Sequence, residues 1–197
     1  SERLGGASRA PFESLNLASH VGDDPLAVDE NRTRLLSALG LREFRERLTM
    51  ADQVHGESIS VIDKDASGSG GYATQDRRPV PAADALITGE PGVPLLMCFA
   101  DCVPIVLVAP GPFVAVVHAG WRGALAGLPG KTARALAKAC PCRIDELVAY
   151  IGPHIGECCY PVGNEILSQF VTTFDAVARD DSRTELDLAA AVTESLS

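Results

Sequence analysis

Apolar residues in the middle of the chain form short runs that turn residues separate. Four such runs lie between residues 84 and 118, with Gly and Pro between them, and each has the length of a buried strand. They read DALIT, PLLMCF, VPIVLVA and FVAVVH. Three further strands are predicted at LTMADQVHG (48–56), ESISVID (57–63) and ELVAYIG (146–152).

Helical periodicity occurs on both sides of this region. In residues 24–40, Asp24 is suited to the N-cap, Pro25 to the first turn and Gly40 to the end of a helix. The apolar residues of this helix fall on one stripe: Val28, Leu35, Leu36 and Leu39. Two more helices are predicted at KTARALAKA (131–139) and NEILSQFVTTFDAV (164–177). Clustered strands with helices outside them predict an α/β fold, in which layered mixed sheets are flanked by helices, in one domain of 197 residues.

The segment from Lys64 to Ala82 shows neither pattern. It reads KDASGSGGYATQDRRPVPA, and its Gly, Ser and charged residues are typical of a surface loop. It lies between the segment that carries His55 and the strands that carry Cys102. We therefore expect a mobile loop that borders a cleft and is long enough to act as a lid.

From Pro91 to Val117, Asp101 is the only ionisable residue apart from cysteines, and a run of this length and character resembles a membrane span. Five prolines divide it into pieces of strand length, which a lipid-exposed helix would not tolerate. The N-terminal SERLGGASRA has no apolar core, so no secretory signal is expected. These features predict a cytoplasmic protein with no membrane partner.

Acidic residues outnumber basic ones by 26 to 17, which gives a net charge of −9. A surface of this sign repels nucleic-acid phosphates and anionic lipids, so neither is the expected partner. Of the six cysteines, Cys140 and Cys142 are separated by one residue and Cys158 and Cys159 are adjacent. These spacings predict poor local disulfides, and the lack of a CxxC pair argues against a structural zinc finger.

A single acid, Asp101, interrupts the apolar stretch LLMCFADCVPIVLV. An unpaired carboxylate is costly in an apolar core, so its presence needs an explanation. One interpretation is a tight turn between two buried strands, with Asp101 capping the turn and Cys102 packing as a small hydrophobic residue. The other is a functional carboxylate that faces a cleft.

Three residues with metal-binding side chains follow strand-like segments at turns. They are His55 in DQVHGE, Cys102 in FADCVP and His118 in VVHAGWRG. Two imidazoles and one thiolate bind Zn²⁺ well and leave the fourth tetrahedral position open, as in catalytic zinc sites. Because the three lie far apart in the sequence and match no local ligand motif, two histidines that are satisfied in the core are the alternative.

Five ordered motifs resemble those of the YfiH-like laccase-domain proteins, which are also described as polyphenol oxidases and purine nucleoside phosphorylases. The motifs are SLNLASHVGDDP, ADQVHG, FADCVPI, VVHAGWRG and IGPHIGECCYPVG, and together they extend over most of the chain. The resemblance implies a β-sandwich-like core flanked by helices and a metal, zinc or copper, held by His55, Cys102 and His118. It also implies that family members continue past the last residue here, so that part of their C-terminal segment is absent.

Two positions depart from the family pattern. Pro161 stands where the family usually has the acid of a tyrosine-glutamate-valine motif, so that carboxylate is missing. His154 occupies a place where the family often has a small residue. We interpret His154 as a surface or packing histidine and not as a ligand.

Three further residues are candidates for substrate binding. Arg122, in GWRG, is suited to bind phosphate through two hydrogen bonds, and a surface arginine packed on Trp121 is the alternative. Asn16 and His20, in SLNLASH, are expected to line the same cleft. Alternatively, Asn16 caps its own turn and His20 fixes the neighbouring strand.

The resemblance implies a zinc-dependent enzyme that splits purine nucleosides with phosphate and deaminates adenosine. Zinc lowers the pKa of bound water to about 7, and Asp101 is the candidate for the carboxylate that transfers the proton. Arg122 is the candidate for seating the phosphate. Because the chain has only four histidines, it cannot also supply a multinuclear copper cluster, and polyphenol oxidation is expected only as a copper-dependent side activity.

A cysteine hydrolase is the alternative, with Cys102 as nucleophile and His118 as base. The expected fold is similar to the deamidase domain of the cytotoxic necrotizing factors, and a bacterial relative is linked to the editing of peptidoglycan precursors, an amidase-like task. Both schemes need the same thiolate. A binding module without catalysis is the third class, and it would tolerate loss of Cys102.

Overall fold

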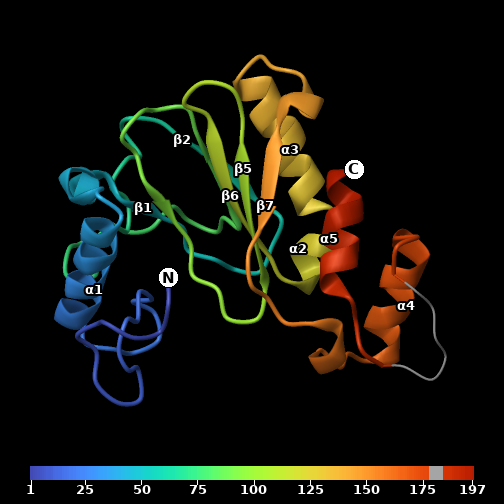
Figure 1. Cartoon of the computed structure of the whole chain (residues 1–197), viewed down its shortest axis with the longest axis horizontal. Coiled ribbons are helices and arrows are strands. Elements are labelled where there is room, and N and C mark those ends of the chain that lie inside the picture. Colours follow the sequence, from blue (N-terminus) through green and yellow to red (C-terminus); the bar gives the residue numbers. More distant parts are fainter. Residues whose placement is uncertain (178–183) are drawn as a thin grey trace.

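A computed structural model describes residues 1–177 and 184–197 of the chain (Figure 1). Its centre is a five-stranded sheet with the strand order β2-β3-β6-β5-β7. Strands β2 and β3 are parallel, and the other neighbours are antiparallel. Strands β1 and β4 form a separate parallel pair. The strands are β1 Thr49–Met50, β2 Ile59–Ile62, β3 Ala85–Thr88, β4 Leu95–Leu96, β5 Val103–Val108, β6 Val114–Ala119 and β7 Val148–Ile151.

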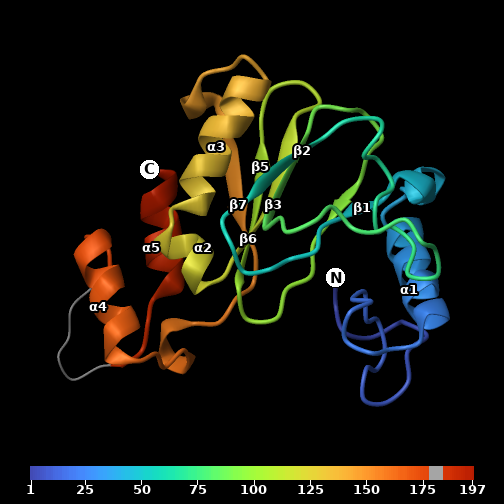
Figure 2. The same cartoon turned by 180° about the vertical axis from the view of Figure 1, so that it is seen from behind.

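Helices lie on both sides of this sheet, with α1 on one side and α2, α3, α4 and α5 on the other (Figures 1 and 2). Helix α3 packs against β3, β5 and β6, and α5 packs against β5. The helices are α1 Pro25–Ala38, α2 Trp121–Leu125, α3 Leu128–Ala139, α4 Asn164–Thr173 and α5 Leu188–Leu196, with 3-10 turns at Arg42–Arg47, Ile144–Glu146 and Glu157–Cys159. The predicted fold class, an α/β core of mixed sheets flanked by helices, is confirmed.

Side-chain alternation along β6 divides the sheet into two faces. Ala115 and Val117 are fully buried in the main core, between the sheet and the helices α3 and α5. Val116 packs in a smaller core cluster on the opposite face. Because side chains alternate along a strand, His118 lies on the same face as Val116, away from those helices.

The buried face of α1 is mixed: Val28 and Leu36 of the predicted apolar stripe are buried, and two polar residues are buried beside them. Asn31 and Arg32 are completely buried, whereas Leu39 is 61% exposed. The Arg32 guanidinium donates hydrogen bonds of 3.1 Å to the carbonyls of both Gly70 and Gly71. A buried charge is tolerated when its donors are satisfied, so hydrogen bonds as well as apolar packing anchor this helix.

The loop from 64 to 82 is held against α1 and is not a lid beside the cleft. The buried Arg45 side chain donates to the Gly71 carbonyl (2.8 Å), and the Asp29 carboxylate of α1 accepts from the amide of Ala73 (2.7 Å). None of the loop residues, all of which the structure describes, lines the cleft that contains the candidate site. The expected position is therefore wrong, because arginines of neighbouring segments bind the carbonyls of the loop.

Two predicted strands are much shorter than expected. Within 48–56 only β1 forms, and within 94–99 only β4 forms. Both strands belong to the separate two-stranded pair, and each soon gives way to a turn, one with His55 and the other with Asp101. Helices α2 and α5 have no counterpart among the predicted elements.

Cys140 and Cys142 form a disulfide, which corrects the expectation of poor local pairing. The chain turns at Pro141 directly after α3, and the two Cα atoms lie 5.4 Å apart. This separation falls within the usual disulfide range of roughly 4.4–6.8 Å. Cys158 and Cys159 are free thiols, as are Cys98 and Cys102.

Within the described ranges, no helix combines the length and the apolar character needed to cross a membrane.

Candidate functional site

His55, Cys102 and His118 converge at one place in the fold. Their possible ligand atoms all lie within 4.8 Å of one another. His55 lies in the turn that follows β1, Cys102 directly precedes β5, and His118 belongs to β6. The two imidazole rings meet edge to face, with centroids 4.8 Å apart. The predicted convergence is therefore confirmed, and the group could hold one metal ion.

Asp84, which directly precedes β3, organises this group although the sequence analysis did not identify it. Its carboxylate is completely buried and accepts hydrogen bonds from the amides of Val54 (3.2 Å), His55 (3.0 Å) and Gly56 (2.7 Å). The same carboxylate lies 2.8 Å from Nδ1 of His118. One buried acid thus fixes both the turn that carries one histidine and the ring of the other.

The surroundings of His118 favour a neutral ring. Burial lowers the pKa of His118, and nearby His55 lowers it further, while the hydrogen bond and the charge of Asp84 act in the opposite direction. A neutral ring that donates from Nδ1 to Asp84 keeps the lone pair of Nε2 available. This is the protonation state in which a histidine binds a metal.

The thiol of Cys102 has anionic neighbours. Burial raises its pKa, and the charges of Asp101 and Asp84 raise it further. Without a nearby cation the group therefore stays a neutral thiol at neutral pH.

Gly120, which lies between β6 and α2, leaves room for this group. A Cβ atom at this position would lie 3.1 Å from Cδ2 of His55 and 3.3 Å from Sγ of Cys102. The φ angle of Gly120 is −73°, so the backbone itself would accept another residue. Space around the candidate ligands, and not backbone conformation, accounts for glycine here.

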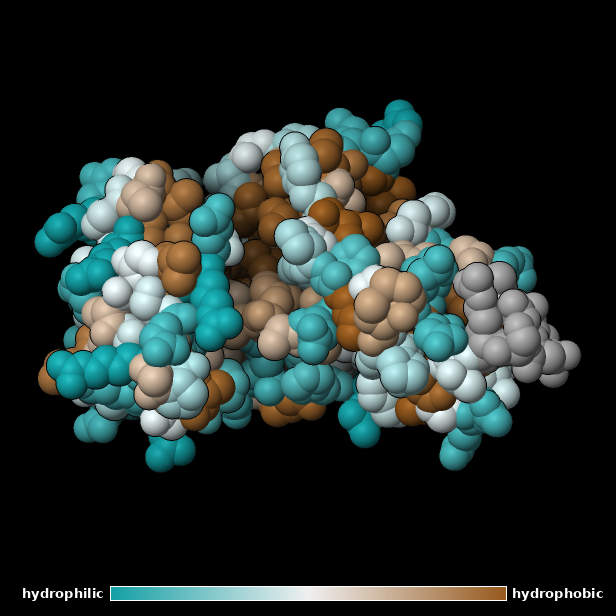
Figure 3. Space-filling model, turned by 60° about the horizontal axis from the view of Figure 1, so that its bottom comes forward, coloured by the Kyte–Doolittle hydropathy of each residue, from teal (hydrophilic) through white to brown (hydrophobic). Residues whose placement is uncertain are grey.

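A cleft opens beside the group, on the sheet face that lies opposite α2–α5. It has a volume of about 810 Å³, and Figure 3 shows a hollow with mainly apolar walls on this side of the molecule. Its lining includes His55 and His118 together with the predicted substrate residues Asn16 and His20. The apolar part of the lining includes Leu15, Leu17, Leu35, Leu95, Leu96, Met97, Phe99, Val106 and Val116.

Asp101 is exposed, which corrects the expectation of a carboxylate in the core. Its φ angle is +75°, so the backbone adopts the left-handed conformation at this bend. Within residues 1–177 and 184–197 its carboxylate accepts no hydrogen bond, so it does not cap the turn. Its backbone carbonyl accepts from the amide of Ile155 (2.9 Å). The side chain is close enough to Cys102 to raise its pKa, but Asp101 does not line the cleft.

Asn16 lines the cleft, but its amide is engaged within its own loop. It donates to the Ala18 carbonyl (3.1 Å) and the Asp23 carboxylate (2.9 Å), and it accepts from the Ala18 amide (3.0 Å). This is the turn-capping arrangement that the sequence left open as the alternative. His20, in contrast, is exposed at the cleft.

Arg122 and His154 lie outside the cleft lining. The guanidinium of Arg122 is exposed and lies 4.3 Å from the centre of the Trp121 ring, which is the packing alternative. Nδ1 of His154 lies 2.8 Å from the Gly152 carbonyl, and His154 is not part of the candidate metal group. Its interpretation as a packing histidine agrees with this contact.

Gln53 also organises the site, although it is not among the residues predicted from the sequence. Its amide donates to the Cys98 carbonyl and accepts from the Cys98 amide, both at 2.8 Å. These two bonds join the turn before His55 to the end of β4. The available signals were the position of Gln53 as the first residue of QVHG and, for Asp84, the acid at the start of DALIT.

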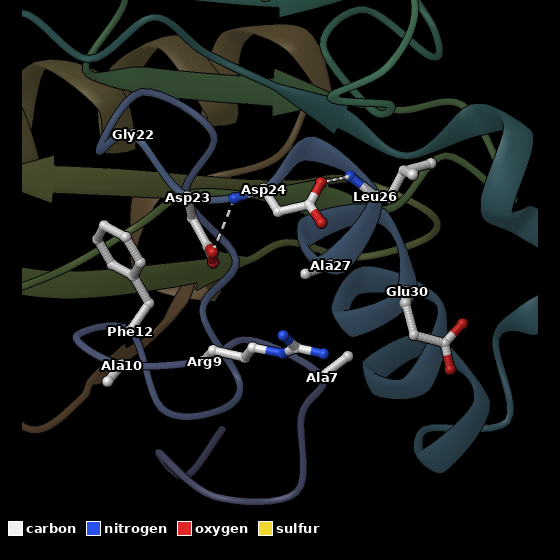
Figure 4. Close-up of a pocket in the computed structure, with 10 residues that line it drawn as sticks. All are labelled: Ala7, Arg9, Ala10, Phe12, Gly22, Asp23, Asp24, Leu26, Ala27 and Glu30. Carbon is white, nitrogen blue, oxygen red and sulfur yellow. Dashed lines mark hydrogen bonds between the residues drawn. The ribbon is translucent and has the colours of Figure 1, made fainter.

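A second hollow lies between the N-terminal segment and the start of α1 (Figure 4). None of the three candidate metal ligands lines it. Arg9 extends along it, while the carboxylates of Asp23 and Asp24 accept from the amides of Asp24 (2.8 Å) and Leu26 (3.0 Å). It shares no lining residue with the cleft within the described part of the chain. The candidate site therefore lies in the cleft.

Fold and site together define a class, an α/β protein with a candidate metal centre of two histidines and one cysteine beside a cleft. The chain belongs to the family described as multi-copper polyphenol oxidoreductase laccase, whose sequence model matches residues 1–197.

Two curated relatives are named for one activity, that of a purine nucleoside phosphorylase. Purine nucleoside phosphorylase YlmD from Geobacillus stearothermophilus is 41% identical over 170 residues, which is 86% of this chain and 61% of that protein. Purine nucleoside phosphorylase YfiH from Escherichia coli is 34% identical over 172 residues, 87% of this chain and 63% of that protein. This chain therefore spans less than two thirds of their length.

Solved structures show the same fold. The crystal structure of YlmD from Geobacillus stearothermophilus has a TM-score of 0.88 and 37% identity, and the match covers 98% of this chain and 73% of that one. The crystal structure of the Bacillus licheniformis hypothetical protein YfiH also has a TM-score of 0.88, with 29% identity. That match covers 98% of this chain and 73% of the other.

Proposed function

We propose that this chain carries the metal-dependent active site of an enzyme that acts on purine nucleosides. The observation that carries the proposal is the convergence of His55, Cys102 and His118 from three separate segments. The relatives' names supply the reaction class, which is phosphorolysis of the glycosidic bond. Hydrolytic deamination of adenosine is proposed as a second reaction of the same site.

The donor set fits zinc, because two imidazole nitrogens and one thiolate are ligands that zinc favours. Copper accepts the same donors, so the proposal names zinc with copper as the other candidate. When bound, the ion would supply a Lewis acid that polarises an oxygen atom of water or substrate. Asp84 orients His118 through Nδ1, which is the arrangement expected behind a metal-binding histidine.

The cleft supplies surfaces that suit a nucleoside. The Phe99 ring lines it 5.6 Å from the ring of His118, and a purine base can stack on such a ring. Asp101 lies outside the cleft lining but next to the proposed ligand Cys102, and from there its carboxylate would accept and return a proton. Arg122 would leave Trp121 to bind phosphate, a movement that its exposed position permits.

A cysteine hydrolase is the second candidate, and one observation favours it. Cys102 would be the nucleophile and His118 its base, and the Asp84 carboxylate lies where it would orient that base. The neighbours of the thiol weigh against it, because a nucleophilic cysteine needs a lowered pKa and cationic surroundings, whereas burial and two carboxylates raise the pKa of Cys102. Anionic surroundings favour a bound cation.

Chelation separates the two candidates. The purified protein is assayed for release of base from inosine in the presence of phosphate and for deamination of adenosine, and bound metal is measured on the same sample. The proposal expects both activities to disappear with the metal after chelation and to return with zinc.

Variants make the assignment specific. His55→Ala should lose metal and activity together, whereas His154→Ala, which removes a histidine outside the group, should lose neither. Full activity after removal of the metal, with inactivation by a thiol-alkylating reagent, would favour the cysteine hydrolase.

A further inference from the structure

Two adjacent cysteines, Cys158 and Cys159, lie on an exposed turn that the proposed function does not use. They belong to the 3-10 turn Glu157–Cys159, and both are exposed free thiols. Their Sγ atoms lie 2.8 Å apart, within reach of an S–H···S hydrogen bond. In contrast, the free thiols of Cys98 and Cys102 are partly buried.

We propose that Cys158 and Cys159 form a redox-sensitive dithiol that closes to a disulfide by exchange with a small-molecule disulfide. One thiolate attacks the reagent disulfide, which forms a mixed disulfide and releases one thiol. The second thiolate attacks the protein-bound sulfur of that mixed disulfide and releases the other thiol. The two cysteines are oxidised by two electrons, the reagent is reduced to two thiols, and the protons of the cysteines go to these thiols.

The environment of the pair allows this stepwise exchange. The hydrogen bond with Cys158, followed by the charge of Cys158, raises the pKa of Cys159. Cys159 is therefore harder to deprotonate while it lies beside Cys158, which suits an exchange in two steps. Their exposure gives a reagent such as oxidised glutathione direct access.

The adjacency of the pair predicts a bond that is easily reversed. Neighbouring Cα atoms across a trans peptide are about 3.8 Å apart, below the usual disulfide range of roughly 4.4–6.8 Å. A disulfide closed at this separation is strained and exposed, and such bonds are the labile and regulatory ones. This differs from Cys140 and Cys142, whose Cα atoms lie 5.4 Å apart.

The turn is attached to the surroundings of the candidate site. Before it, the amide of Ile155 donates to the carbonyl of Asp101 (2.9 Å). After it, the carbonyl of Tyr160 accepts from the amide of Leu186 (2.9 Å). The dithiol therefore lies in the segment that borders the Asp101 turn, but its chemistry does not depend on the proposed function.

Trypsin provides a direct test, because cleavage after Arg143 and Arg179 gives a fragment whose only cysteines are Cys158 and Cys159. The full chain is equilibrated in buffers of increasing oxidised-to-reduced glutathione ratio, quenched with N-ethylmaleimide, digested and analysed by mass spectrometry. We expect a fragment with two maleimide labels at low ratio. At high ratio it should carry no label and be lighter by two hydrogen atoms, and dithiothreitol should reverse the change.

The variants Cys158→Ser and Cys159→Ser remove one partner each and should retain one glutathione on the same fragment. Three results would overturn the proposal: two labels at every ratio, a glutathione that persists on the unsubstituted fragment, or a disulfide from either cysteine to Cys102. Peptides 78–122, which contain Cys98 and Cys102, show in the same digest whether the exchange is confined to the exposed pair.

Discussion

At the scale of single residues, Asp84 controls the candidate site. Its carboxylate accepts three amide hydrogen bonds from the turn at His55 and lies 2.8 Å from Nδ1 of His118. These donors replace the water that the carboxylate loses on burial. The residue thus links the geometry of the proposed ligands to the stability of the fold.

Asp84→Asn should weaken both metal binding and the stability of the fold. The amide NH₂ group would face backbone N–H groups that need an acceptor, so we expect a loss of about 1.5–3 kcal/mol in the free energy of unfolding and a fall of about 10–100-fold in metal affinity. Urea unfolding and metal titration measure the two effects. Asp76→Asn, at an exposed position, is the control, and equal behaviour of the two variants would contradict the assigned role.

Gly120→Ala tests the space around the proposed ligands. The added methyl group would approach His55 and Cys102 at 3.1 and 3.3 Å, and such overpacking costs about 1–3 kcal/mol. Because His55 is exposed and can move, we expect the cost to appear as metal affinity lowered about tenfold or more, with little change in unfolding. Gly163→Ala is the control and should leave metal affinity unchanged, because a Cβ there meets nothing within 4 Å. Unchanged metal affinity in Gly120→Ala would be inconsistent with a metal held by His55 and Cys102.

Asp101→Asn tests the proposed proton carrier. The amide keeps the shape but cannot accept the proton, so we expect turnover of adenosine to fall about 10²-fold or more. Because the side chain is exposed, the free energy of unfolding should change by less than about 0.5 kcal/mol, and bound zinc should stay at the level of the unsubstituted protein. An active variant would remove Asp101 from the mechanism.

At the scale of elements, α1 holds the N-terminal side of the cleft through polar contacts. Arg32 is completely buried and donates to the carbonyls of Leu17, Gly70 and Gly71. Leu17 belongs to the segment that lines the cleft, and the two glycines belong to the loop that packs on α1. One side chain therefore joins three segments that are distant in sequence.

Arg32→Met keeps much of the volume but leaves three carbonyls without donors. We expect the free energy of unfolding to fall by at least about 2–3 kcal/mol, since each unsatisfied buried group costs about 1–3 kcal/mol. Arg34→Met, on the exposed side of the same helix, should change it by less than about 0.5 kcal/mol. Equal unfolding midpoints in urea for the two variants would show that the buried contacts do not stabilise the helix.

The sequence predicted the elements that have a clear period. Strands β5 and β6 and helix α1 were found because their residue patterns are long enough to show a period and are bounded by turn residues. Helix α2 has only five residues, too few to show a period. In the described part of the chain, strands β1 and β4 pair only with each other, and a pairing of this kind depends on tertiary contacts that an apolar run does not encode.

At the scale of the whole molecule, the site lies where the two faces of the sheet differ. Helices α3 and α5 cover one face, while β6 presents His118 to the cleft on the other. The three proposed ligands were identifiable from their motifs and their places at turns. Asp84 was not, because its partners lie about thirty residues away in the sequence on both sides, and only the folded chain brings them to one carboxylate.

The central claim is that His55, Cys102 and His118 bind one metal ion. X-ray absorption at the zinc edge, on protein loaded with one equivalent of zinc and then dialysed, tests it most directly. The account predicts retained zinc with nitrogen ligands at about 2.0–2.1 Å and one sulfur ligand at about 2.3 Å, the sulfur being lost in Cys102→Ser. Zinc that dialyses away, or a first shell without sulfur in the unsubstituted protein, would contradict the claim.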